Sequence, residues 1–357
     1  MRIPQELIDA IIAEFDEQFD AETKATLQAC ALVARSFVRV SQTQLFSRIS
    51  VYDYDQNPTI LSQQLAELLA RAPHLAGYIR TLDLYYNRNT PEAQFVSRIF
   101  CAVTQVHTLI LTSSFKEPFP IDTSILAVFA LPSLRRVELI QYRFANVQEL
   151  GSLLRRSRFL QDLSLCEVDF SGDECAGRAP STDESASSSS SSSRVVLKAL
   201  TLVKMEPIDV EMMLELDSFT TVDINHLHSL SFTESPVTGL LRANAGSIQT
   251  VKIGNTFRSF ENSNYEDEID RGMLACDNQL SSLDFETEDL ESVLIALPLF
   301  GDLTYLKALK TIRIALSEPL REDAHEAEQW AELDALLAQC RGPDSGSFGN
   351  SAKIQYH

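Results

Sequence analysis

The sequence has 357 residues, of which 45% are hydrophobic and 22% are charged, and its formal net charge is −20 at pH 7. A chain of this composition can fold and bury a sizeable core. The acidic balance argues against binding to the nucleic-acid backbone, because that function needs an excess of Lys and Arg.

No apolar run approaches the roughly 20 residues that a membrane helix needs. The N-terminus also lacks the basic and then apolar segments of a secretion signal. We therefore expect no membrane partner and an intracellular protein, in the cytoplasm or the nucleus.

The first 50 residues predict three short helices. Pro4 suits the first turn of the first helix, because proline has no N–H to lose there. The apolar residues of this helix form a wide face: Leu7, Ile8, Ile11, Ile12 and Phe15. An acidic linker over 16–23 separates it from a second helix around Leu27 to Ala34, and a third helix is expected over 38–46. Helices this short gain stability by packing on a partner or on the elements that follow.

Beyond residue 78 a short apolar pattern recurs nine times, Leu-x-Leu or a close relative. Its members are Leu82/Leu84, Leu109/Leu111, Val137/Leu139, Leu163/Leu165, Leu200/Leu202, Leu230/Phe232, Val251/Ile253, Leu283/Phe285 and Ile312/Ile314. Successive pairs are 21 to 37 residues apart. Strand-like alternation at a spacing of about 29 residues is typical of a leucine-rich-repeat-like solenoid, in which each unit buries its apolar face against its neighbours.

Between most pairs the apolar residues follow helical spacing. The predicted helices cover 92–103, 121–130, 147–156, 209–216, 236–243, 288–297 and 326–340. Alternating strands and helices predict an α/β fold with parallel strands on the concave side of the solenoid and helices on the convex side. The alternative is an ordinary α/β domain. Against it stands the absence of a glycine-rich turn of the G-x-G-x-x-G or G-x-x-x-x-G-K-[ST] type.

The residues that alternate with the inward positions should line the concave, substrate-binding face. They are Asp83, Tyr85, Ile110, Thr112, Arg136, Glu138, Ser164, Thr201, Ser231, Thr233, Lys252, Asp284, Glu286 and Arg313. A one-residue error in strand phase would exchange the whole set with the core. The set is mixed and polar, which favours a protein ligand over a small molecule.

Two segments depart from the repeat. Residues 171–194 contain a serine run and almost nothing apolar, so we expect a disordered insertion, either an inert linker or a phosphate acceptor. Residues from about 319 to 357 should form a C-terminal cap, with a helix that carries Trp330 and a candidate last strand over 352–356. The alternative for this helix is docking to a partner.

The charged residues are unevenly distributed. Residues 135–158 contain six Arg against two acidic residues, whereas 261–289 contain ten acidic residues against one Arg. Such runs are commonly solvated faces. The sharper hypothesis is that they give the binding surface opposite electrostatic ends, the Arg cluster meeting an acidic or phosphorylated segment.

No metal site or cofactor is predicted. The six Cys are scattered without a C-x-x-C spacing, so free thiols are expected. His226 and His228 would share one face of a strand as a polar surface pair, and no further ligands are placed to complete a metal site with them. The motifs G-x-S-x-G and H-E-x-x-H are also absent, so we expect no enzyme.

Three N-terminal segments together resemble an F-box of the kind found in fungal F-box proteins. They are residues 3–12 (IPQELIDAII), 27–37 (LQACALVARSF) and 44–49 (QLFSRI). Residues 65–84 are similar to the segment that leads those proteins into their repeats. The resemblance implies an F-box-like domain over 1–50, a helical linker or cap over 51–77 and a leucine-rich-repeat-like domain over 78–357.

The same resemblance implies a function: the N-terminal helices dock on the Skp adaptor of a cullin-based ubiquitin ligase, and the repeats hold an unknown protein substrate. By position in the motif, the candidate adaptor-binding residues are Pro4, Leu7, Ile8, Ile12, Leu32 and Val33. Two alternatives stay open from the residues themselves. These positions could form the core of the helical unit, and the chain could be a repeat scaffold that joins no ligase.

Overall fold

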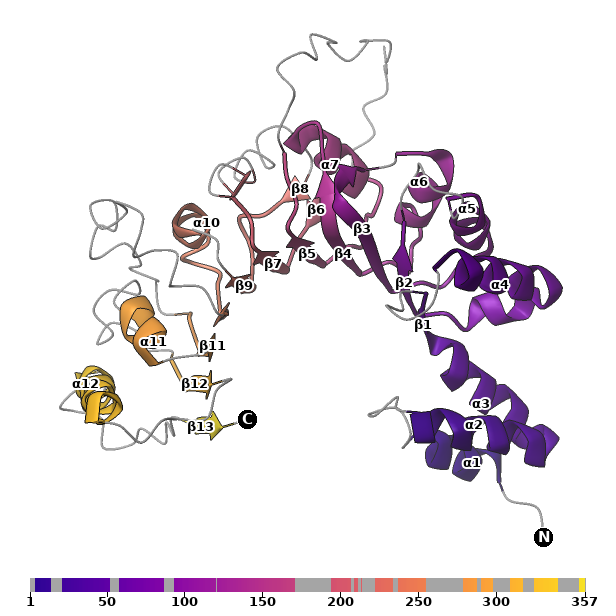
Figure 1. Cartoon of the computed structure of the whole chain (residues 1–357), viewed down its shortest axis with the longest axis horizontal. Helices are drawn as coiled ribbons and strands as arrows, with labels where there is room; N and C mark the ends of the chain where they lie inside the picture. The colour runs from indigo at the N-terminus through magenta and orange to yellow at the C-terminus, as the bar shows by residue number, and fades with distance from the viewer. Residues whose placement is uncertain are drawn as a thin grey trace. The chain divides into compact units, whose positions relative to one another are not determined.

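The computed structural model describes residues 4–13, 21–51, 58–86, 93–119, 121–170, 194–206, 209–210, 213, 222–233, 237–254, 279–287, 290–297, 309–316, 324–339 and 353–356. The fold is α/β with a large parallel sheet, as Figure 1 shows. The chain divides into two compact units. The first unit contains Met1–Arg143 and Arg156–Leu160, and the second contains Phe144–Arg155 and Gln161–His357.

The first unit begins with the three predicted helices, α1 (Gln5–Ala13), α2 (Ala21–Val33) and α3 (Arg35–Ser47). Their common core is Ile8, Ile12 and Leu27, which are almost fully buried. The acidic linker predicted over 16–23 is wrong at its end, because α2 already begins at Ala21. Residues 14–20 lie outside the described part of the chain. The predicted helical segment over 51–77 contains α4 (Pro58–Arg71) and the 3-10 helix η1 (Pro73–Gly77).

Four parallel strands follow in the order of the sequence. They are β1 (Arg48–Ser50), β2 (Thr81–Tyr85), β3 (Thr108–Pro118) and β4 (Arg136–Arg143). The predicted apolar pairs lie in register, with Leu82 beside Leu109 and Leu84 beside Leu111, and these four side chains are fully buried. The predicted strand phase is therefore confirmed in this unit. Strand β1 was not predicted, because three residues directly after a helix carry too little alternation to recognise.

Helices α5 (Ala93–Ala102) and α6 (Thr123–Phe129) connect β2 to β3 and β3 to β4. Asp122 is the N-cap of α6: its Oδ1 accepts hydrogen bonds from the backbone N–H groups of Ser124 and Ile125, both at 2.9 Å. The hydroxyl of Tyr86 donates to the other carboxylate oxygen of Asp122. Asp122 therefore links the end of β2 to the start of α6.

The ionised carboxylate of Asp122 is expected to make stability pH-dependent. Burial alone would raise its pKa, but hydrogen bonds from Ser124, Tyr86 and Ile125 outweigh burial and hold the pKa below the ordinary value of 3.8. A depressed pKa stabilises the fold above pH 3.8, and this stabilisation is lost as the pH falls through the lower folded value. Urea midpoints measured from about pH 7 down to pH 2 should thus fall more steeply for the wild type than for Asp122→Asn. Parallel pH profiles would contradict this role of the charge.

The described part of the second unit begins with α7 (Val147–Leu154) and contributes seven parallel strands to the large sheet. These are β5 (Asp162–Cys166), β7 (Ala199–Val203), β9 (Ser229–Thr233), β10 (Thr250–Ile253), β11 (Ser282–Thr287), β12 (Thr311–Leu316) and β13 (Lys353–Tyr356). Their buried residues form continuous rows, one of which runs from Leu163 through Leu200, Leu230, Val251 and Leu283 to Ile312. The predicted strand phase is confirmed here as well, and β13 is the predicted last strand.

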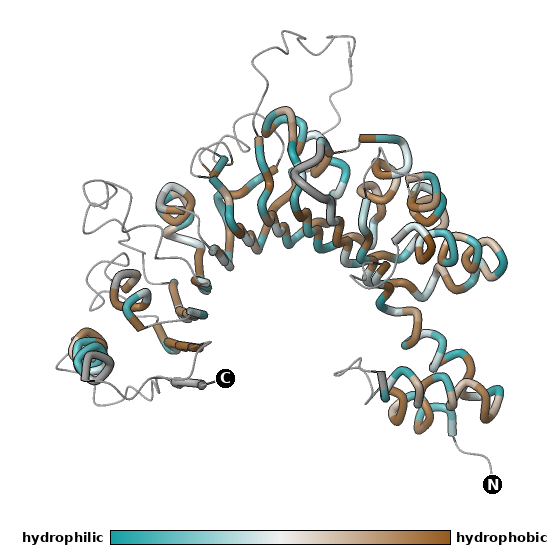
Figure 2. Tube along the Cα trace, viewed as in Figure 1, coloured by the Kyte–Doolittle hydropathy of each residue, from teal (hydrophilic) through white to brown (hydrophobic). Residues whose placement is uncertain are grey.

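The connections of the second unit are only partly described. Helices α10 (Thr238–Ala243), α11 (Leu290–Ala296) and α12 (Ala324–Gln339) match predicted segments, whereas only residues 209, 210 and 213 of the helix predicted over 209–216 are described, and these are helical. A small sheet of β6 (Val195–Val196) and β8 (Val222–Asp223) was not predicted. The Ser-rich run 171–193, residues 261–278 of the acidic run and residues 319–323, 340–352 and 357 of the predicted cap lie outside the described residues. Figure 2 shows hydrophobic and hydrophilic residues interleaved along the strands and helices.

Candidate interaction surface on the polar face of the strands

In the first unit, five of the six predicted surface residues lie in two rows across neighbouring strands. Asp83 is beside Ile110, which is beside Glu138, and Tyr85 is beside Thr112. Most of these side chains are half-buried, as expected of a sheet face. Thr112 is an exception at 9% exposure, and Ser113 after it is buried too. The alternation ends here because the register between β3 and β4 shifts after Thr112, so Thr112 is not part of the accessible face.

Asp83 is the electrostatically distinct member of this face. Burial raises the pKa of its carboxyl, and a hydrogen bond from Ser50 and the charge of Arg48 offset part of that effect. The Ser50 hydroxyl lies 2.9 Å from Asp83 Oδ2. Asp83 is thus a partly shielded carboxylate that a partner could engage with a hydrogen-bond donor.

The second unit presents one long row of outward residues. Thr201, Ser231 and Lys252 are neighbours in successive strands, and Asp284 and Arg313 continue the row. Ser164 starts this row beside Thr201 but is only 6% exposed, so it is not part of the accessible face.

Across the successive strands from β7 to β12, the side chains of this row change from hydroxyls to charged groups. Lys252, Glu286 and Arg313 are exposed, and Lys252 Nζ forms an ion pair with Glu286 Oε2 at 2.5 Å. Thr233, on the neighbouring row, is half-buried. The β10–β12 part of this face therefore alternates positive and negative groups, which suits a protein ligand with complementary charges.

The arginines of the Arg-rich stretch 135–158 have different surroundings in the structure. Arg135 donates through Nη1 to the carbonyls of Pro132 and Leu134 and lies 4.9 Å from the ring centre of Phe159. Arg136 is exposed and lies 3.4 Å from Glu138, which offsets part of its charge. Consecutive Arg residues therefore have different environments.

Two of the six predicted adaptor-binding residues belong to the core. Ile8 is 2% exposed and Ile12 is fully buried, because both pack on Leu27 of α2. Assigning them to an accessible surface is wrong. Pro4, Leu7, Leu32 and Val33 are exposed, the last two at 87% and 76%.

The exposed members lie at the start of α1 and at the C-terminal end of α2. The side-chain amide of Gln5 donates to the carbonyl of Ser36 at 3.2 Å, which places the first turn of α1 beside the junction of α2 and α3. Leu7 follows Gln5 by two residues, and Val33 precedes Ser36 by three. Ile11, which was not among the predicted adaptor-binding residues, is 46% exposed on the same helix as Leu7. We call Leu7, Ile11, Leu32 and Val33 the exposed apolar set.

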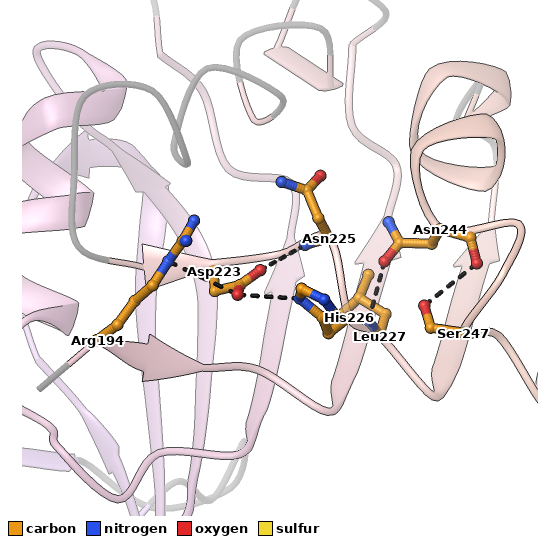
Figure 3. Close-up of polar contacts among 7 residues, drawn as sticks. All are labelled: Arg194, Asp223, Asn225, His226, Leu227, Asn244 and Ser247. Carbon is orange, nitrogen blue, oxygen red and sulfur yellow. Dashed lines mark hydrogen bonds and ion pairs between the residues drawn. The ribbon is translucent and has the colours of Figure 1, made fainter.

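A polar cluster around Asp223 was not predicted (Figure 3). The carboxylate of Asp223 accepts from the backbone N–H of Asn225 at 2.9 Å and contacts His226 Nδ1 at 3.0 Å, and it lies 3.6 Å from Arg194 Nε. Burial would raise the pKa of Asp223, but these hydrogen bonds and charges outweigh it and lower the pKa. The cluster fixes the turn between β8 and β9. His226 and His228 both precede β9, so their predicted place on one strand is wrong.

Neighbouring Asn244 provides a second polar anchor and is itself buried at 1% exposure. Its Oδ1 accepts from the N–H of Leu227, and its Nδ2 donates to the carbonyl of Leu240, both at 2.9 Å. Asn244 therefore ties the end of α10 to the residues that lead into β9. The sequence offered no signal for it beyond an asparagine after a helix.

Within the described ranges, no group of three or more His, Cys, Asp or Glu side chains could hold a metal ion. None of the helices in the described part of the chain combines the length and the apolar composition that crossing a membrane requires. Among the described residues, Cys30, Cys101 and Cys166 lie outside any disulfide bond, as predicted, and the other three cysteines lie outside the described residues.

No protein-family model matches the sequence, and no curated protein matches it either.

Proposed function

We propose that the chain is a substrate adaptor of the F-box type. In this proposal, the three-helix bundle docks on the Skp adaptor of a cullin-based ubiquitin ligase. The strands form the concave side of a leucine-rich-repeat-like solenoid, which binds a protein substrate. The protein would act inside the cell by proximity, bringing its substrate to the ligase without a catalytic side chain or cofactor of its own.

The observation that carries the docking half of the proposal is the exposed apolar set. Leu32 and Val33 end a helix with most of their surface in water, although Leu27 of the same helix is fully buried. Several exposed apolar side chains on so small a bundle favour a partner interface over a solvated surface. The F-box resemblance names that partner as the Skp adaptor.

The substrate half of the proposal is supported by the in-register polar rows. A parallel sheet with one apolar face buried and the other face lined by hydroxyl, acidic and basic groups offers an extended surface for a protein chain. The accessible candidates from the prediction are Asp83, Tyr85, Ile110, Arg136, Glu138, Thr201, Ser231, Thr233, Lys252, Asp284, Glu286 and Arg313.

The test is capture of the purified full chain by the purified Skp adaptor. Leu32→Asp should abolish capture, because the charge would be buried without a partner in the complex, while the free chain keeps its helicity by circular dichroism. The matched control is Gln28→Asp, which adds the same charge at another exposed position of α2.

Failure of the folded wild-type chain to bind the Skp adaptor would overturn the adaptor proposal. It would favour the alternative, a repeat scaffold in which the three helices cap the sheet and join no ligase. Equal loss of binding in the Gln28→Asp control would show that charge on α2, and not the exposed apolar set, determines docking.

A further inference from the structure

One edge of the first unit's sheet carries a row of basic residues that the repeat pattern does not explain. The residues directly before β2, β3 and β4 are Arg80, His107 and Arg135. The N–H of His107 donates to the carbonyl of Arg80 at 2.7 Å, and the N–H of Arg135 donates to the carbonyl of His107 at 2.8 Å. Since neighbouring strands lie about 4.8 Å apart, the backbone of this row spans about 10 Å.

The two guanidinium groups of the row are held by backbone carbonyls. Arg80 donates through Nη1 to the carbonyls of Gly77 at 2.8 Å and Gln105 at 3.3 Å. Arg135 donates through the same atom to Pro132 and is further fixed against the Phe159 ring. Carbonyls orient a guanidinium without neutralising it, so these contacts leave its charge and its other N–H groups available to an anion.

Among the residues that the structure describes, neither Arg80 nor Arg135 forms an ion pair with a carboxylate. Arg136, one position further along β4, is by contrast paired with Glu138. The positive charges of Arg80 and Arg135 are thus not offset by a carboxylate of the described residues.

His107 completes the row between the two arginines and is exposed. Although the side chain is exposed, its partial burial is the main cause that lowers the pKa of the imidazole, followed by the charges of Arg80 and Arg135. No acidic group of the described residues opposes these effects. The guanidinium groups of Arg80 and Arg135 therefore lie near enough to His107 to disfavour its protonated form. An anion bound there would reverse that effect, because it would favour the protonated imidazole.

The position before each strand of the main sheet is free of carboxylates in the described second unit as well. There it is occupied by Gln161, Lys198, His228, Gln249, Ser281 and Lys310. Among the described strands, however, only those of the first unit place a histidine at this position with an arginine on each side of it.

We propose that Arg80, His107 and Arg135 form a binding site for the phosphate group of a phosphorylated peptide. A phosphate offers several acceptor oxygens and nearly two negative charges to oriented guanidinium donors, whereas a carboxylate offers two oxygens and one charge. A peptide is the favoured carrier because the net charge of −20 opposes the long, uniformly charged backbone of a nucleic acid. The site is independent of ligase association, so it would exist equally in a scaffold.

The site can be tested by NMR on the purified full chain, with His107→Gln used to assign the ring signals of His107. The probe is an acetylated and amidated Gly-phosphoserine-Gly peptide, compared with its unphosphorylated form. We expect only the phosphopeptide to shift these signals and to raise the pKa of His107. Identical responses to the two peptides would overturn the proposal.

Variants separate a specific site from general attraction. Arg135→Gln should weaken binding of the phosphopeptide by about tenfold or more, because it removes a charged donor. Arg71→Gln, which removes the same charge from an exposed position of α4, should leave binding unchanged. Equal effects of the two variants would contradict the site.

Because Arg135 also contacts backbone carbonyls, the fold of each variant is checked by circular dichroism. Arg135→Lys serves as the second variant: it keeps the charge, loses the planar fork, and should bind with intermediate affinity. Binding as weak as that of Arg135→Gln would contradict the part that charge plays in the site.

The source of the phosphate is decided by two further probes. Inorganic phosphate should bind more weakly than the phosphopeptide, and a short single-stranded oligonucleotide should not bind more tightly. Equal binding of inorganic phosphate, or tighter binding of the oligonucleotide, would overturn the assignment to a phosphopeptide.

Discussion

Leu111→Ala should lower the free energy of unfolding of the first unit by about 3 kcal/mol. Leu111 is fully buried on β3, with Leu84 and Leu139 beside it in the neighbouring strands. The substitution removes apolar contacts and leaves a cavity that the two neighbouring strands cannot close without breaking their register. The measurement is urea unfolding followed by circular dichroism.

The matched control for Leu111→Ala is Ile110→Ala on the same strand. Ile110 points to the opposite face, is half-buried and lies beside Asp83 and Glu138. Its truncation should cost about 1 kcal/mol or less, since less surface returns to water and no closed cavity forms. If Ile110→Ala destabilised the unit as much as Leu111→Ala, the assignment of the two faces of β3 would be wrong.

Asn244→Leu should destabilise the second unit by about 2 to 3 kcal/mol. The leucine has about the same size, but it cannot accept the hydrogen bond from the N–H of Leu227, which would stay buried without a partner. The carbonyl of Leu240 would be affected less, because it also accepts from the backbone N–H of Asn244. Fluorescence of Trp330, the single tryptophan of the chain, can report unfolding of this unit.

Ser247→Ala provides the control for Asn244→Leu. Ser247 lies near Asn244 in Figure 3 and donates to its backbone carbonyl at 3.2 Å, but it is only partly buried. Its loss should cost less than about 1 kcal/mol, because water can replace the hydroxyl. A similar cost for both substitutions would show that the buried amide of Asn244 has no special part in joining α10 to β9.

The strands were predictable because the local alternation of each apolar pair indicates which face of the strand is buried. In Leu82 and Leu84, as in Leu283 and Phe285, two apolar residues flank one polar residue, which fixes the buried face by local alternation alone. Parallel pairing followed from the helical spacing between these pairs. Elements of two or three residues, such as β1 and β6, are too short for any periodicity and were missed.

The surface residues were harder to predict, because exposure depends on neighbours that are distant in the sequence. Leu7, Ile8, Ile11 and Ile12 are similarly apolar in sequence, and only the packing of α2 and α3 decides that Ile8 and Ile12 are buried. Thr112 and Ser164 follow the alternation and are nevertheless covered. Similarly, Arg80, His107 and Arg135 become neighbours only once the register of three strands is known.

In the second unit, the register of neighbouring parallel strands does not depend on the length of the connection between them. Leu163 and Leu200 are 37 residues apart, whereas Leu230 and Val251 are 21 residues apart, yet both pairs sit directly opposite each other. Closing a longer connection costs little additional free energy, since the entropy grows only with the logarithm of its length. Insertions and deletions between strands can therefore accumulate during evolution while the alignment of the sheet is preserved.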